Sequence, residues 1–181
     1  MTTPSAVGTV ATTVAAKARY LYFPGCSLHS TAEEYNDSTQ ALLKALGLAF
    51  EELDDWNCCG ATPAHATSSF LAEALPLRNL VNAEKQVEKW GAAAKDGPVE
   101  ILVPCAACYN AFRLAEHSVR SGDAHGREIN QDIAEITGRG FGGAVTVRHP
   151  LDILGRREEV ARLGGLVKRP LGGLKVACYY G

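Results

Sequence analysis

The 181-residue sequence has no apolar run close to the roughly 18–20 residues that a transmembrane helix needs, so we expect no membrane span. It also has little charge imbalance, because a net charge of −2 gives no electrostatic reason to expect a nucleic-acid partner. The composition, with 46% hydrophobic and 21% charged residues, is ordinary for a globular chain with a real core.

The first 18 residues lack the features of a signal peptide, since a basic start and a Leu-rich segment are both missing. Small and β-branched residues make up most of this stretch. We therefore expect residues 1–18 to be a disordered N-terminal tail, with a cleaved targeting peptide as the alternative. The protein is predicted to be cytoplasmic.

The remainder alternates between predicted strands and helices. Short apolar runs that end at Gly or Pro indicate strands, and apolar residues at helical spacing indicate helices. The predicted strands cover 18–25, 48–53, 97–104, 143–149 and 173–181, and the predicted helices cover 30–47, 67–91, 106–122, 127–138 and 151–167. Ser30 and Glu33 have the spacing of a capping box for the first helix. This alternation indicates an α/β fold with a mainly parallel sheet flanked by helices.

Six cysteines are the most informative residues: Cys26, Cys58, Cys59, Cys105, Cys108 and Cys178. A chain of this length does not need the disulfide staples of a small secreted domain. Neighbouring cysteines such as Cys58 and Cys59 do not easily close an unstrained disulfide with each other. The CxxC pair of Cys105 and Cys108 points instead to metal or redox chemistry.

Five of these cysteines follow predicted strands. Cys26 follows the first strand, Cys58 and Cys59 the second, and Cys105 the third, while Cys108 lies one helical turn beyond Cys105. The carboxyl ends of parallel strands share one edge of a sheet, and ligand sites form in the crevice there. The sequence therefore predicts that these five thiols meet at that edge.

Three kinds of site remain open from the residues alone. A structural zinc ion takes four ligands, often from two CxxC pairs, but only one such pair is present. The compact ferredoxin run of four cysteines is also absent. Five dispersed thiols favour an iron–sulfur cluster with an unusual ligand set, with zinc and a redox-active dithiol as alternatives.

Three motifs carry a resemblance to a known family: "PGC" at 24–26, "NCCGATPAH" at 57–65 and "VPCAACYN" at 103–110. Together they resemble the cysteine-rich CCG domain, and most of all the N-terminal half of the CCG-domain subunit of heterodisulfide reductase. With 31 residues between Cys26 and Cys58 the first spacing fits that family, whereas 45 between Cys59 and Cys105 is longer than expected. The resemblance implies a noncubane [4Fe–4S] cluster bound as cofactor by Cys26, Cys58, Cys59, Cys105 and Cys108.

The family carries two such domains in tandem, which sets the expected domain limits. We expect one CCG-type domain over residues 19–173 and the start of a truncated second repeat over 174–181, because "VACYYG" resembles "YLYFPG" at 20–25. In that alignment Cys178 matches Tyr22 and is predicted to be a core residue of a strand. One cluster alone can pass electrons without reducing a heterodisulfide, so the chain by itself is expected to be inactive in that reaction.

The resemblance implies an oxidoreductase that cleaves a disulfide with electrons from flavin-containing and ferredoxin-type iron–sulfur subunits. This chain has no flavin-binding fingerprint of its own, so no flavin is expected in it. His29 and His65 follow the cysteines closely and are weak proton-donor candidates, with a capping role as the alternative. The competing hypotheses are an electron-transfer subunit of a lactate, glycolate or glycerol-3-phosphate dehydrogenase, and a zinc-stabilised interaction domain.

Overall fold

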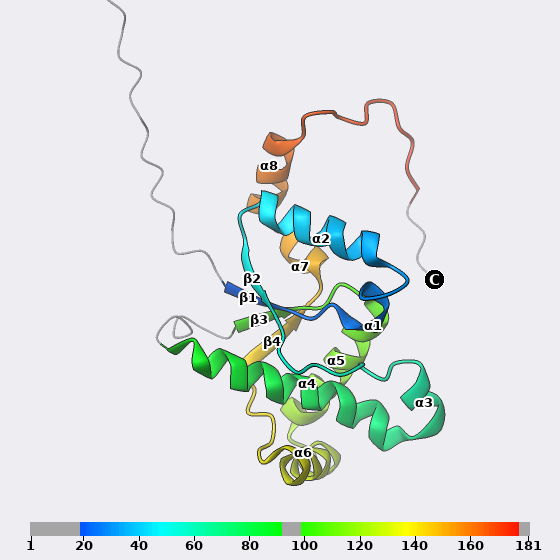
Figure 1. Ribbon diagram of the computed structural model, residues 1–181, viewed down its shortest axis with the longest axis vertical. Helices are drawn as coiled ribbons and strands as arrows, with labels where there is room; N and C mark the ends of the chain where they lie inside the picture. Colours follow the sequence, from blue (N-terminus) through cyan, green and yellow to red (C-terminus); the bar gives the residue numbers. More distant parts are fainter. Residues whose placement is uncertain (1–18, 92–98, 178–181) are drawn as a thin grey trace, which may run out of the picture.

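A computed structural model describes residues 19–91 and 99–177 of the chain. Within these ranges four strands and eight helices follow one another in the alternating order that the sequence indicates (Figure 1). The strands are β1 (Arg19–Tyr22), β2 (Ala49–Glu52), β3 (Val99–Leu102) and β4 (Val145–Arg148). The helices are α1 (Gly25–Leu28), α2 (Glu33–Ala45), α3 (Pro63–Thr67), α4 (Ser69–Lys89), α5 (Ala106–Ser121), α6 (Ala124–Thr137), α7 (Pro150–Leu154) and α8 (Arg157–Leu166).

All four strands are parallel and form one sheet in the order β2-β1-β3-β4. This confirms the predicted α/β class with a parallel sheet between helices. The ladder continues past the strand ends, since the Leu53 N–H donates to the Tyr22 carbonyl and the Phe23 N–H to the Leu102 carbonyl. The carboxyl ends of β1, β2 and β3 are therefore aligned at one edge, where the following loops begin together.

Alternate residues of β1 enter two different cores, as the period-2 geometry of a strand requires. Tyr20 and Tyr22 pack with α2 and α7 on one face of the sheet. Leu21 and Phe23 belong to the larger core on the opposite face, which α4, α5 and α6 cover (Figure 1). Both faces of β1 are buried, and this explains why its sequence is apolar and aromatic without alternation.

The start of the first long helix differs from the capping-box prediction. Helix α2 begins at Glu33 with Ala32 as its N-cap, and no side chain caps it. The Ser30 hydroxyl donates instead to the Cys26 carbonyl at 2.9 Å, within the turn that carries the first cysteine. Further along, α4 runs through Pro76 as one continuous helix.

The last predicted strand is wrong over the part that the structure describes. Residues 174–177 are not in a strand, and Leu174 and Val176 are 61% and 75% exposed. Cys178 and the rest of that predicted strand lie outside the described residues, as does the predicted tail over 1–18. The proposed limits of a second repeat therefore stay a prediction.

Candidate functional site

The aligned strand ends place five cysteines around one edge of the sheet. Cys26 lies in α1 directly after β1, and Cys58 and Cys59 lie in the loop between β2 and α3. Cys105 is the N-cap of α5, and Cys108 lies in the first turn of that helix. We call these residues the five-cysteine set. All of them are free thiols.

Two close sulfur pairs join the separate segments of the set. The Cys26 and Cys58 Sγ atoms lie 3.7 Å apart, and the Cys59 and Cys108 Sγ atoms lie 3.0 Å apart. The first pair is open to solvent at Cys26, whereas Cys59 and Cys108 are only 3% and 5% exposed. The Cys105 thiol interacts with that of Cys108 and completes the chain of contacts. Residues far apart in the sequence thus bring their sulfur atoms together.

The two buried thiols, Cys59 and Cys108, have pKa values shifted in opposite directions. The hydrogen bond between the Cys59 and Cys108 thiols, assisted by the Ala61 backbone N–H, lowers the pKa of Cys59 to about 6 against the opposing effect of burial. The same hydrogen bond, together with burial, raises the pKa of Cys108 far above its usual value. Burial also raises the pKa of Cys58, although the Gly60 N–H counteracts it from 3.5 Å. The site therefore stabilises one thiolate, at Cys59, near neutral pH.

Two glycines allow the backbone to pass close to the sulfur atoms. Gly25 has φ +74°, and a Cβ atom there would lie 3.2 Å from the Cys108 Sγ atom. Gly60 has φ +72°, and a Cβ atom there would lie 2.8 Å from both the Ala64 Cβ and the Leu75 Cδ1 atoms. An L side chain would be strained in this conformation and would also meet these neighbours.

The Asn57 side chain, directly before the double cysteine, bonds to backbone carbonyls. The Asn57 side-chain amide donates to the backbone carbonyls of Cys58 and Leu75, at 2.8 and 3.2 Å. The Asn57 backbone in turn bonds to the side chain of Asn79 in α4. Asn79 was not predicted from the sequence, because no motif marks a single amide within a long helix.

The two candidate proton donors have different surroundings. The His29 Nε2 atom lies 3.2 Å from a Glu52 carboxylate oxygen, and the His29 ring packs on Trp56 at 5.2 Å between centroids. His65 lies in α3 and lines a groove between α3, α4 and α5. Their roles as proton donors stay predictions.

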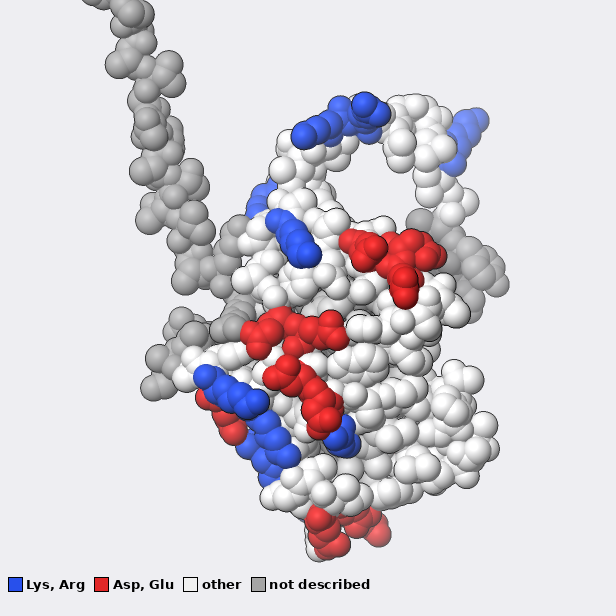
Figure 2. All heavy atoms as spheres, viewed as in Figure 1, with Lys and Arg blue, Asp and Glu red and all other residues white. Residues whose placement is uncertain are grey.

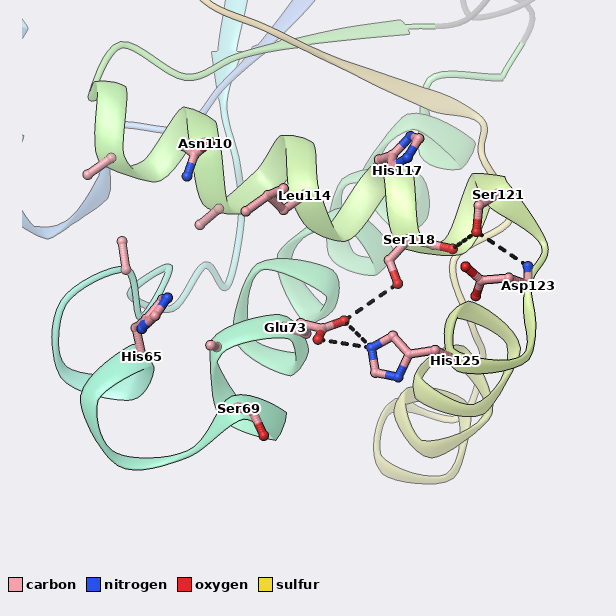
Figure 3. A pocket seen from close by; sticks show the side chains of 14 residues that line it. His65, Ser69, Glu73, Asn110, Leu114, His117, Ser118, Ser121, Asp123 and His125 are labelled. Carbon is pink, nitrogen blue, oxygen red and sulfur yellow. Dashed lines mark hydrogen bonds and ion pairs between the residues drawn. The ribbon is translucent and has the colours of Figure 1, made fainter.

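The groove has a volume of about 540 Å³, within the usual range for small-molecule sites. One end lies beside the cysteines, since Ala61 and Ala107 line it. Figure 3 shows His65 and Asn110 toward that end and Glu73 with His125 at the other. The His125 Nε2 atom lies 2.9 Å from each Glu73 carboxylate oxygen. This bond is the main reason that the pKa of His125 is raised.

The surface on the α3 side of the double cysteine carries no charged Lys, Arg, Asp or Glu side chain. From Trp56 to Ala72 the sequence contains no Lys, Arg, Asp or Glu. Figure 2 shows the resulting charge-free area over α3, whereas acidic and basic side chains gather elsewhere on the same face. The approach to the site on this side is thus through neutral side chains.

The sulfur atoms of the five-cysteine set contact one another in a chain rather than around one point. Among the residues that the structure describes, no three His, Cys, Asp or Glu side chains are arranged to hold a single metal ion. The ligand set of a multi-iron cluster, whose metal atoms each take different ligands, stays a prediction.

A known family covers the segment that carries this site. The family described as a cysteine-rich domain, CCG, matches residues 20–113, which run from β1 into α5 and include the five-cysteine set. The chain belongs to the CCG family. The predicted resemblance is confirmed at this level, while the closer assignment to heterodisulfide reductase is not shown.

The chain is also similar to a subunit of a different reductase. The 8-methylmenaquinol:fumarate reductase membrane anchor subunit of Wolinella succinogenes is 29% identical over 162 residues, which cover 90% of this chain and 51% of the relative. The chain thus spans about half the length of the curated relative it matches. This similarity supports a redox role and an oxidoreductase association for the CCG domain.

The comparison also corrects the predicted localisation. The relative is a membrane anchor subunit, so the expectation of a cytoplasmic protein is wrong. In the described ranges no helix is both long enough and apolar enough to cross a membrane. The prediction rested on the missing signal-peptide features, and the absence of such features does not establish where a chain resides.

Proposed function

We propose that the five-cysteine set holds a noncubane [4Fe–4S] cluster and that the chain is an electron-transfer subunit of a multi-subunit reductase. The observation that carries this proposal is the convergence of three strand ends, with sulfur pairs at 3.7 and 3.0 Å. Electron transfer requires a redox centre held by a fixed scaffold. The aligned parallel strands provide such a scaffold here.

The donor chemistry of the site fits an iron–sulfur cluster. Thiolate sulfur is the usual ligand of such clusters, and the environment of Cys59 already favours the thiolate. Two of the five sulfur donors are buried, while Cys26 remains exposed at the rim. When bound, the cluster would supply one-electron transfer between a partner subunit and the acceptor. The role of the chain is to hold the ligands and to limit the access of water.

In finer detail, we propose the reaction class of heterodisulfide reductase. Two electrons from flavin-containing and ferredoxin-type subunits, together with two protons, convert a disulfide into two thiols. The groove that begins at Ala61 and Ala107 offers a small disulfide a path to the cysteines. His65, which lines that end, and His29, three residues after Cys26, are the proposed proton donors.

The relative favours a second candidate function. A chain similar to a fumarate reductase subunit can pass electrons within an assembly whose chemistry takes place on another subunit. In that case the five-cysteine set serves electron transfer alone, and disulfides are not its substrates. Purification of the native assembly separates the candidates, because the first predicts that the assembly reduces a disulfide and the second that it reduces a dicarboxylate.

The test of the shared proposal is the metal content of the chain. Protein purified under strict exclusion of oxygen is expected to contain about four iron and four acid-labile sulfide per chain, with a visible absorption band. Zinc at one equivalent would support the interaction-domain hypothesis instead. Protein that takes up no iron under reconstitution with iron and sulfide would contradict the proposed function.

A further inference from the structure

We infer that Asn79 is a positioning residue for the double cysteine, and that it fixes the loop which presents Cys58 and Cys59. This inference rests on the proposed function for its purpose, but its geometric content concerns the chain alone. Asn79 lies in the middle of α4 and is fully buried. It contacts none of the five sulfur atoms in the described hydrogen bonds, so it can act on the site only through the loop.

The side chain of Asn79 clamps one backbone unit of the loop. Its Oδ1 atom accepts the Asn57 N–H at 2.9 Å, and its Nδ2 atom donates to the Asn57 carbonyl at 2.9 Å. This is the reciprocal pairing that a neighbouring strand would offer. Asn57 directly precedes Cys58, so the clamp fixes the backbone from which the two cysteines project.

The clamp continues into the cysteine itself through a second amide. The Asn57 Nδ2 atom donates to the Cys58 carbonyl, and its Oδ1 atom accepts from the Arg78 guanidinium at 2.8 Å. The Asn57 side chain is thereby oriented from both ends. Arg78 also donates to the Asp55 carbonyl at 2.9 Å, which holds the loop two residues earlier.

These contacts belong to a polar ladder along one face of α4, which comprises Asn79, Asn82 and Gln86 at spacings of three and four residues. Asn82 donates to the Asp55 carbonyl at 2.9 Å. Gln86 accepts the Asp54 N–H at 2.8 Å and donates to the Glu52 carbonyl at 2.9 Å. The ladder thus accompanies the chain from the end of β2 to the double cysteine.

Because Asn79 is buried, it requires the loop backbone in one particular arrangement. Its neighbours in α4, Leu77, Leu80 and Val81, are in the apolar core. An amide in such surroundings is costly unless all its groups are bonded, and the loop backbone supplies both bonds. The loop and the amide therefore fit each other in one arrangement, which places the sulfur atoms of Cys58 and Cys59 toward Cys26 and Cys108.

The ladder offers a matched control for the test. Gln86 lies on the same helix, is 2% exposed and makes three comparable bonds, but these bonds hold the end of β2 rather than the residue before Cys58. Asn79→Leu and Gln86→Met each replace a buried amide by an apolar side chain of similar size. Both substitutions remove hydrogen bonds made by α4, but only Asn79→Leu removes the bonds to Asn57.

The experiment measures iron release to a chelator and the spectrum of the reconstituted full chain. We expect Asn79→Leu to release iron at least about tenfold faster than wild type and to shift the electron paramagnetic resonance signal, as loss of an outer partner of a metal site typically does. Gln86→Met should remain within about twofold of wild type at a comparable thermal midpoint. Equal release rates and equal spectra in the two variants would overturn the inference. If Asn79→Leu does not fold, Asn79→Asp replaces it in the same measurements, because it keeps the acceptor for the Asn57 N–H but removes the donor to the Asn57 carbonyl.

A second readout separates this inference from the proposed function. In metal-free protein, alkylation of Cys58 followed by mass spectrometry reports the order of the loop, with the exposed Cys26 as the internal reference. We expect Asn79→Leu, but not Gln86→Met, to raise the Cys58 rate relative to Cys26. If wild type binds no iron, the proposed function fails, and the relative alkylation rates still decide whether Asn79 holds the loop. Unchanged relative rates in both variants would reject the clamp.

Discussion

The Cys59 and Cys108 sulfur atoms lie 3.0 Å apart although 49 positions separate the two residues in the sequence. One residue comes from the loop after β2 and the other from the first turn of α5. Both are buried in the core that covers one face of the sheet, beside Phe23 and Phe112. The contact therefore forms only in the folded domain. We expect loss of either partner to disturb the other cysteines of the site.

Removal of one sulfur from this pair tests the ligand assignment. We predict that Cys59→Ala loses iron or converts the cluster to another type, because it deletes a thiolate from the double cysteine. Cys178→Ala is the control, since Cys178 is outside the proposed ligand set. This variant should retain full iron content. Iron and sulfide assays with the visible spectrum measure both variants. Wild-type iron and an unchanged spectrum in Cys59→Ala would contradict the assignment of Cys59.

The opposite pKa shifts of Cys59 and Cys108 predict that the stability of the metal-free chain depends on pH. The pKa of Cys59 is lowered to about 6 in the fold, against about 8.5 for a free thiol. Its contribution to stability is present above the unfolded pKa and is lost as the pH falls through about 6. The raised pKa of Cys108 has the opposite sign, since its contribution is present below the unfolded pKa and declines above it.

The measurement is chemical denaturation between pH 5.5 and about 8.5, the free thiol value. Wild-type stability should rise across this window by more than that of Cys59→Ala, by about 1–3 kcal/mol given the size of the shift and the coupling of the pair. Absorbance at 240 nm, which reports thiolate, should appear at lower pH in wild type than in this variant. Parallel stability curves for the two proteins would show that Cys59 does not carry the depressed pKa.

Much of the fold follows from local patterns in the sequence. The apolar run at β1 and the Gly or Pro residues after the strands predicted the sheet, and the parallel order follows from the intervening helices. The meeting of the cysteines followed from their positions after three strands. Residues 30–33 show where local rules failed, because Ser30 bonds to the Cys26 carbonyl and leaves α2 without its expected cap.

Other features of the site had no distinct signal. Asn79, Asn82 and Gln86 resemble the solvated face of an amphipathic helix, and only the path of the β2–α3 loop shows that they face its backbone. The groove is formed where small residues such as Ala72 and Ala111 from different helices leave space. Alanine at any one position is common, so a cavity between helices cannot be read from one sequence.

The groove offers a prediction about His125. Its pKa is raised chiefly by the hydrogen bond to Glu73, so Glu73→Gln should lower it toward the ordinary histidine value. Any stability from this pair is present below the unfolded histidine pKa and is lost as the pH rises. Nuclear magnetic resonance titration of the imidazole measures the change.

The control for His125 is Ser118→Ala, which removes only a 3.5 Å contact to the same carboxylate. This variant should leave the pKa of His125 near its wild-type value. An unchanged titration of His125 in Glu73→Gln would show that the pair seen at 2.9 Å is not maintained in solution.

Gly60 is predicted to be the least replaceable glycine beside the double cysteine. Alanine there must adopt φ +72°, and its Cβ atom would lie 2.8 Å from side chains of α3 and α4. The control is Gly122→Ala at the end of α5, where φ is +67° but no atom lies within 4 Å of the new Cβ. Both variants carry the backbone strain of about 1 kcal/mol, and only Gly60→Ala adds steric overlap, for a total of about 2–4 kcal/mol.

Denaturation midpoints measure the difference, and Gly60→Ala should also retain less iron, because relief of the overlap moves the backbone next to Cys59. Equal destabilisation by the two substitutions, with wild-type iron in both, would show that the loop accommodates a side chain at Gly60.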